Sequence, residues 1–285
     1  MNEFTNSSDT EQTPNKQDKI YWHDAFFAAL QLEFNDYIDA LTFEDERQLS
    51  KEALAMDVLI IKKAADIEIN KNIGKILKGH NIFEYKSEKD YLSVWDYNKV
   101  MGYAMIYSAF EEIAVDNITI SFAVTPKPSK LFDYLENTRG FKVDEVHPGI
   151  YYVKGDTFPI QIIECKKLAT EDNVFLKNLR SSLTQKDMED VFNAYRKYGS
   201  LEKVSIYLNR VLDANKLIFE EVLAMSGAAV QDIISDFIKK NGMEDRIKED
   251  KARDTALEML RRGFALDEIA DIVKMPLEWV KNLAK

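Results

Sequence analysis

Cysteine and long apolar runs are both scarce in this sequence of 285 residues. The single cysteine, Cys165, excludes an internal disulfide framework and favours a reducing compartment. No segment approaches the roughly 20 consecutive apolar residues that span a bilayer. Residues 1–19 lack the basic start and apolar run of a secretion signal, and their polar composition is typical of a disordered lead-in. We therefore expect a cytoplasmic protein with no membrane partner.

Basic side chains are also in deficit, since the formal net charge is −11. Nucleic-acid binding is largely electrostatic and requires Lys and Arg, so the total charge argues against a nucleic-acid partner. The distribution of charged residues along the chain weakens this argument. Residues 1–56 hold 12 acidic and 4 basic side chains, whereas residues 60–90 hold 7 lysines and 5 acidic side chains. Most of the excess acid therefore lies outside the segment that contains the candidate site.

Several common types of catalytic site have no signature here. The three histidines, His23, His80 and His147, are scattered without the spacing of metal ligands. One cysteine without a histidine partner is more typical of a buried thiol than of a nucleophile. The sequence also has no Gly-rich phosphate-binding loop.

Hydrophobic periodicity predicts an α/β domain followed by helices. Apolar residues at intervals of three and four predict a helix from Trp22 to Leu41, and the apolar run 58–61 is typical of a strand covered on both sheet faces. Further strands are expected at 42–49, 55–62, 81–86 and 118–124, with a hairpin joining 150–153 to 160–163. Further helical segments are expected at 72–78, 92–109 and 128–138. Beyond Lys167 the patterns are helical, with breaks near residues 199, 213, 227, 242 and 263.

The expected order is helix, three strands, helix and strand, with later additions. It predicts an α/β domain over residues 20–168 and an all-helical C-terminal region over residues 169–285.

Two of the predicted strands carry charged side chains that point to one spot. Residues two apart on a strand share a face, so Glu84 and Lys86 project together. Asp57 begins the apolar strand and can converge on the same spot if the two strands are neighbours. Two carboxylates suit Mg²⁺ or Mn²⁺, and a metal with an adjacent ammonium can activate water and neutralise a phosphate. The alternative is an exposed strand with an alternating surface ladder of charges.

At these residues the sequence resembles the PD-(D/E)XK nuclease superfamily, in particular its bacterial recombination-promoting nuclease and transposase-like branch. The matching text is Met56-Asp-Val-Leu-Ile-Ile61 followed by Asn81-Ile-Phe-Glu-Tyr-Lys86-Ser. The resemblance covers roughly residues 20–165 and implies a restriction-endonuclease-like αβββαβ core with a mixed sheet. It implies a metal-dependent DNA endonuclease, linked to recombination or mobile elements.

The resemblance also implies a role for each matching residue. Asp57 and Glu84 become metal ligands, the main-chain carbonyl of Tyr85 is a candidate third ligand, and Lys86 positions water or stabilises the phosphate. Relatives often carry an acidic residue on the first helix, for which Glu33 is the best candidate, with Asp24 and Glu44 as alternatives.

Some related nucleases have Gln, three residues and then Tyr on the helix after the lysine. This chain departs from that pattern with Lys99-Val-Met-Gly-Tyr103, so Lys99 is expected to contact phosphate instead. For Trp95, Tyr103 and Tyr107, packing against the sheet is favoured over base stacking.

The C-terminal segment from Ala256 resembles the helix-turn-helix-like end of the same branch. Gly263 is expected to stop one helix, Asp267 to start the next and Pro276 to open the last. The last ten residues offer only Lys281, Asn282 and Lys285 to a DNA groove, so packing or homodimer formation is favoured there. The alternative function for the whole chain is a catalytically inactive nuclease-fold protein that acts as a binding or assembly module through its helical tail.

Overall fold

The computed structural model describes residues 22–48, 55–62, 67–198 and 202–284, which form two compact units. Unit 1 comprises the described residues up to Ser181 together with Ile206–Ala214, and unit 2 comprises those of Ser182–Ser205 and Asn215–Lys285. Unit 1 thus extends past the boundary expected near residue 168, because helix α4 (Thr170–Lys177) packs against helix α1 (His23–Glu33). The predicted lead-in, residues 1–19, lies outside the described residues.

Unit 1 is built on a mixed seven-stranded sheet in the order β1-β2-β3-β4-β7-β6-β5. Its strands are β1 (Leu41–Gln48), β2 (Ala55–Lys62), β3 (His80–Lys86), β4 (Ile118–Val124), β5 (Lys142–His147), β6 (Ile150–Lys154) and β7 (Ile160–Glu164). The first three strands are antiparallel, β3, β4 and β7 run parallel, and β7, β6 and β5 are again antiparallel. The α/β class, the mixed sheet and the helical C-terminal region are as predicted.

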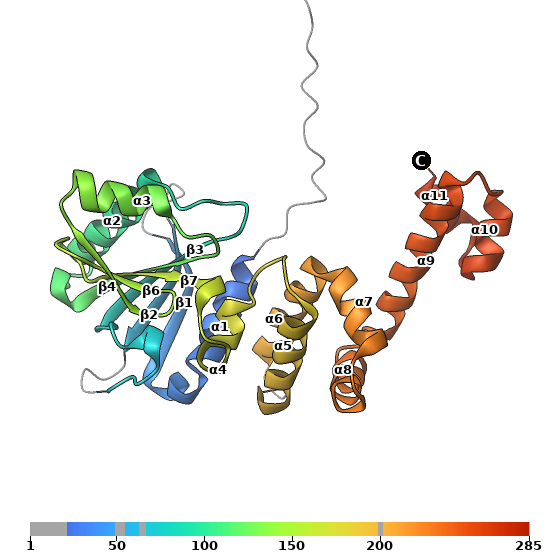
Figure 1. The fold of residues 1–285 in the computed structure, drawn as a ribbon, viewed down its shortest axis with the longest axis horizontal. Coiled ribbons are helices and arrows are strands. Elements are labelled where there is room, and N and C mark those ends of the chain that lie inside the picture. The colour runs from blue at the N-terminus through green and yellow to red at the C-terminus, as the bar shows by residue number, and fades with distance from the viewer. Residues whose placement is uncertain (1–21, 49–54, 63–66, 199–201, 285) are drawn as a thin grey trace, which may run out of the picture. The chain divides into compact units, whose positions relative to one another are not determined.

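Helices cover both faces of this sheet (Figure 1). Helices α2 (Val94–Phe110) and α3 (Ser129–Asp133) share one apolar cluster with the sheet residues Ile82, Ile120 and Phe122. On the opposite face, Phe26 of α1 stacks on Tyr85, with 4.9 Å between the ring centroids. Because strand side chains alternate, Glu84 and Lys86 lie on the α2 face of β3, whereas Phe83 and Tyr85 lie on the α1 face.

Several elements differ from the sequence predictions, among them the segment expected as helical over 72–78, which is a 3₁₀ turn over Asn72–Gly74. The first helix ends at Glu33 rather than Leu41, since a 3₁₀ turn over Asn35–Ala40 leads directly into β1. The segment expected as a helix over 128–138 is α3 followed by a π turn over Tyr134–Thr138. Strand β5 was not predicted, because none of its side chains is buried and the sequence shows no apolar alternation.

Beyond Glu164 the described residues contain no strand, as the sequence predicts. The later helices, which follow α4, are α5 (Gln185–Tyr198), α6 (Glu202–Ala214), α7 (Lys216–Met225), α8 (Ala228–Lys240), α9 (Glu244–Arg261), α10 (Leu266–Val273) and α11 (Leu277–Leu283). In unit 2, α5 packs on α7 and α8, and α9, α10 and α11 form a separate apolar cluster. In the part of the chain that the structure describes, no helix has the length and apolar character needed to cross a membrane.

Candidate functional site

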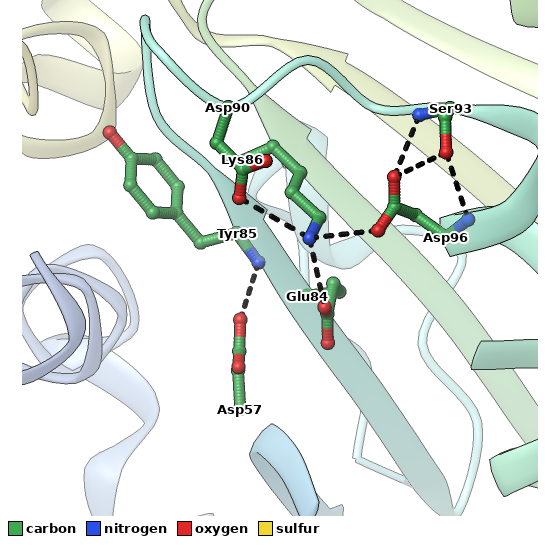
Figure 2. Close-up of polar contacts among 7 residues, drawn as sticks. All are labelled: Asp57, Glu84, Tyr85, Lys86, Asp90, Ser93 and Asp96. Carbon is green, nitrogen blue, oxygen red and sulfur yellow. Dashed lines mark hydrogen bonds and ion pairs between the residues drawn. The ribbon is translucent and has the colours of Figure 1, made fainter. Parts of the chain in front are cut away.

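Asp57 and Glu84 lie side by side where two strands of unit 1 stop pairing. The antiparallel ladder between β2 and β3 reaches the pair Val58 and Phe83, so Asp57 and Glu84 are the next residues on each strand. The Asp57 Oδ2 atom accepts a hydrogen bond of 2.9 Å from the main-chain N–H of Tyr85. Figure 2 shows Asp57 and Glu84 on neighbouring positions of this part of the sheet. The two carboxylates predicted from the sequence are therefore brought together.

Lys86 joins this pair through its ammonium group. Its Nζ atom lies 3.7 Å from Glu84 Oε1, 3.3 Å from Asp90 Oδ2 and 3.1 Å from Asp96 Oδ1. Figure 2 shows these three carboxylates directed at the ammonium from different sides. The Lys86 side chain is only 11% exposed, so the charge is held in one place by its partners. The Lys86 ammonium is thus a cation fixed by the carboxylates around it, and the site is not an exposed ladder of surface charges.

Burial and mutual repulsion shape the protonation of the carboxylates. Burial and the neighbouring Asp57 carboxylate raise the pKa of Glu84 to about 8. Burial also raises the pKa of Asp57, although the hydrogen bond from Tyr85 opposes this effect. For Lys86, burial acts to lower the pKa, but Glu84, Asp96 and Asp90 together raise it above the ordinary value. Lys86 therefore keeps its proton, while the two carboxylates repel one another.

Lys99 lies on α2 and acts electrostatically on the same two carboxylates, while its contact with phosphate stays a prediction. Its charge acts to lower the pKa of both Glu84 and Asp57. The Nζ atom lies 5.4 Å from the centre of the Tyr103 ring, and a side-chain hydrogen bond with Tyr103 raises the pKa of Lys99. The Lys99 side chain is exposed, so a second cation faces solvent near the buried Lys86 ammonium.

Glu33 is not brought to this pair. Its Oε2 atom lies 2.6 Å from Lys71 Nζ, and its Oε1 atom accepts hydrogen bonds of 2.9 and 3.0 Å from the N–H groups of Phe175 and Leu176. These two N–H groups follow Asn173, which has non-helical backbone angles within α4. Glu33 therefore joins α1 to α4. The expectation of a metal ligand on the first helix does not fit these contacts.

The other predicted ligands have clear positions. Asp24 is exposed in the first turn of α1, and Glu44 lies on β1 across from Leu59. Tyr85 places its main chain between the two carboxylates, and its hydroxyl donates a hydrogen bond of 2.7 Å to the Leu179 carbonyl. The Tyr85 carbonyl thus belongs to a well-anchored part of the strand.

Three residues near the site were not singled out from the sequence. Asp90 and Asp96 hold Lys86, and His23 has a charge that lowers the pKa of Asp57 when the ring is protonated. Asp96 does carry a sequence signal, because Ser93-x-x-Asp96 has the spacing of a capping box before an apolar helix. His23 has no such signal, since its contacts join residues more than twenty positions apart, such as the 2.6 Å contact of Nε2 with Asp45 Oδ1.

The donor chemistry of the site fits a hard divalent cation. Three carboxylates, those of Glu84, Asp90 and Asp96, contact the Lys86 ammonium, Asp57 lies next to Glu84, and Lys99 adds a second positive charge. A cation bound at the Asp57 and Glu84 pair would relieve the repulsion that contributes to the raised pKa of Glu84, and it would displace the proton that Glu84 otherwise holds. Among the described residues, no group of three or more His, Cys, Asp or Glu side chains is arranged to hold a metal. Two carboxylates suffice for Mg²⁺, which usually keeps several waters.

Comparison of the chain with protein-family models, with curated proteins and with solved structures finds no match. The chemistry of this site is therefore inferred from its residues and their geometry. Those residues are two adjacent carboxylates, a buried ammonium beside them and an exposed lysine at the same place.

Proposed function

We propose that the chain is a divalent-metal-dependent nuclease that hydrolyses phosphodiester bonds of DNA, with a restriction-endonuclease-like PD-(D/E)XK core in unit 1. The observation that carries the proposal is the junction of Asp57, Glu84 and Lys86 on neighbouring strands, with Lys86 Nζ 3.7 Å from Glu84 Oε1. The element order α1, β1, β2, β3, α2, β4 also agrees with the αβββαβ core that the sequence resemblance implies.

Each residue has a distinct task in this proposal. Asp57 and Glu84 would hold Mg²⁺ or Mn²⁺, with the Tyr85 carbonyl as a candidate further oxygen ligand. The bound metal would make water nucleophilic and neutralise charge on the phosphate. The Lys86 ammonium, which keeps its proton, stabilises the negative charge that develops on the phosphate as water adds to phosphorus and the bond to one ester oxygen breaks. Lys99 binds a phosphate at the exposed side of the site.

The test is cleavage of supercoiled plasmid and of single-stranded DNA by the purified chain in Mg²⁺, Mn²⁺ or chelator. We expect metal-dependent cutting that Lys86→Ala lowers by a factor on the order of 10² to 10³. Lys154→Ala is the matched control, because Lys154 forms an exposed ion pair with Asp144 at the other end of the sheet. A folded wild type that cuts neither DNA nor RNA would overturn the proposal.

An assembly role is the second candidate, and apolar exposure in unit 2 favours it. Leu217 and Met225 on α7 are 76% and 73% exposed, and Ile272 on α10 is 52% exposed. Helices with such residues are suited to bury them against a second copy of the chain. Sedimentation of the wild type beside Leu217→Glu tests this role independently of cleavage, since Leu217 lies outside the unit that holds the carboxylates.

A further inference from the structure

The exposed face of α2 carries no acidic side chain, although the whole chain has a net charge of −11. The exposed residues of this helix before its last position recur at intervals of one helical turn. They are Trp95, Asn98, Lys99, Gly102, Met105 and Ala109. The face thus combines one large aromatic ring, an amide and a lysine, and it begins beside the carboxylate pair.

Trp95 is the most exposed large apolar residue of this face. The interpretation of the α2 aromatics as packing residues is confirmed for Tyr103 and Tyr107, which are 3% and 1% exposed. For Trp95 it is wrong, because the indole is 79% exposed. A ring of this size buries 150–250 Å² in a core or an interface, so its exposure leaves a large apolar surface available to a flat partner.

The position of Trp95 connects it to the proposed site. The next residue is Asp96, whose Oδ1 atom lies 3.1 Å from Lys86 Nζ. Lys99 lies one turn further along the same face, and its charge acts to lower the pKa of Glu84. The rise of a helix separates Trp95 from Lys99 by about 6 Å along the axis. An exposed aromatic ring and an exposed cation therefore border the same edge of the site.

We propose that Trp95 stacks on an unpaired nucleobase while Lys99 contacts a neighbouring phosphate, so that the protein acts on single-stranded nucleic acid. The inference rests on the proposed nuclease function and names its substrate class. Bases in a duplex are stacked on one another and cannot offer a free face to the indole, whereas every base of a single strand can. The lysine and the absence of carboxylates on this face suit the charge of the strand.

The experiment measures binding of a fluorescently labelled single-stranded DNA 20-mer, and of the same sequence as a duplex, in chelator so that no metal-dependent cleavage occurs. We expect Trp95→Ala to weaken single-strand binding by about tenfold or more, since stacking on one aromatic ring contributes that much. Trp95→Tyr should restore most of the affinity. The matched control is Phe110→Ala, because Phe110 is 73% exposed on the same helix but about 22 Å further along it.

The possible results separate this inference from the nuclease proposal. Single-strand binding that depends on Trp95, without any cutting in Mg²⁺ or Mn²⁺, would support the stacking role and overturn hydrolysis. Cutting of the single strand with equal affinity and rate in Trp95→Ala and wild type would overturn the stacking role alone. Equal weakening of single-strand and duplex binding would overturn the single-strand preference. Unchanged DNA affinity with lost self-association of Trp95→Ala would assign the face to a second copy and overturn the inference.

Discussion

Unit 1 and unit 2 differ in what they bury. Among the described residues, the buried Asp, Glu, Lys and Arg side chains, those of Glu33, Glu84, Lys86 and Arg180, all lie in unit 1. The described buried polar residues of unit 2 are the neutral Asn215 and Ser226. Burying a charge is costly and is sustained only by partners that compensate it. Unit 1 therefore maintains a charged interior, whereas unit 2 is held by apolar packing.

The largest effect on stability is expected from substitution of Glu33. It tests whether this buried charge stabilises the fold of unit 1. Glu33→Ala leaves Lys71 without this carboxylate and two N–H groups of α4 without an acceptor. We expect a loss of about 3 kcal/mol in the free energy of unfolding, at the lower end for a broken buried pair because Lys71 is partly exposed. Urea denaturation followed by circular dichroism measures the change.

Glu33→Gln is the matched control for this substitution. It retains an oxygen acceptor for the N–H groups of Phe175 and Leu176 but removes the charge, so it should cost less than Glu33→Ala. Calorimetric titration with Mn²⁺ should give the same affinity for the wild type and Glu33→Gln. A large loss of Mn²⁺ affinity in Glu33→Gln would instead show that Glu33 takes part in metal binding.

A smaller effect, confined to unit 2, is expected from the apolar cluster of α9, α10 and α11. Ile269 is fully buried there, with Met259 and Val280 among the buried residues of the same cluster. Ile269→Ala should cost about 2 kcal/mol, because the removed methyl groups leave a cavity in a small cluster that can partly collapse. Hydrogen exchange of the peptides over 256–284 should accelerate, while the rate of DNA cleavage stays unchanged.

Cys165 provides the control in unit 1 for the Ile269 experiment. It is the only cysteine of the chain, it is 1% exposed, and burial raises the pKa of its thiol to about 12. Its reaction with a thiol reagent therefore requires unit 1 to open. Equal labelling of wild type and Ile269→Ala would show that the two units respond separately, and faster labelling in the variant would contradict this separation.

The sequence predicts the strands of unit 1 well where apolar runs are strong. Strand β4 has the predicted bounds, and β2 covers the predicted residues 55–62. These segments are apolar because the sheet is covered on both faces. Strand β5 was missed because it lacks such an apolar run, whereas the end of α1 was missed because the apolar pattern runs past it. At Tyr37 and Leu41 the apolar spacing continues the helical pattern, but the chain has already turned toward β1.

At the proposed site, too, the sequence predicts the arrangement of residues close together in the chain but not the contacts of distant ones. The alternation of a strand predicts that Glu84 and Lys86 share a face, and the ammonium does lie beside Glu84. The partners of Glu33 could not be predicted, because Phe175 is 142 positions away in the sequence. Exposure of Trp95 could not be predicted either, since helical spacing alone does not show which face of α2 the sheet covers.

The smallest expected effect on stability concerns one type of helix cap, which occurs in both units. Ser93 caps α2, where its Oγ atom accepts a hydrogen bond of 3.1 Å from the N–H of Asp96, and Thr184 caps α5 in unit 2 through a 3.2 Å hydrogen bond from the N–H of Asp187. Removing either hydroxyl by substitution with alanine should cost about 1 kcal/mol. Only Ser93→Ala should also slow DNA cleavage, by a few-fold, because Asp96 holds Lys86. Equal cleavage by both variants would show that the cap of α2 stabilises the fold without positioning the lysine.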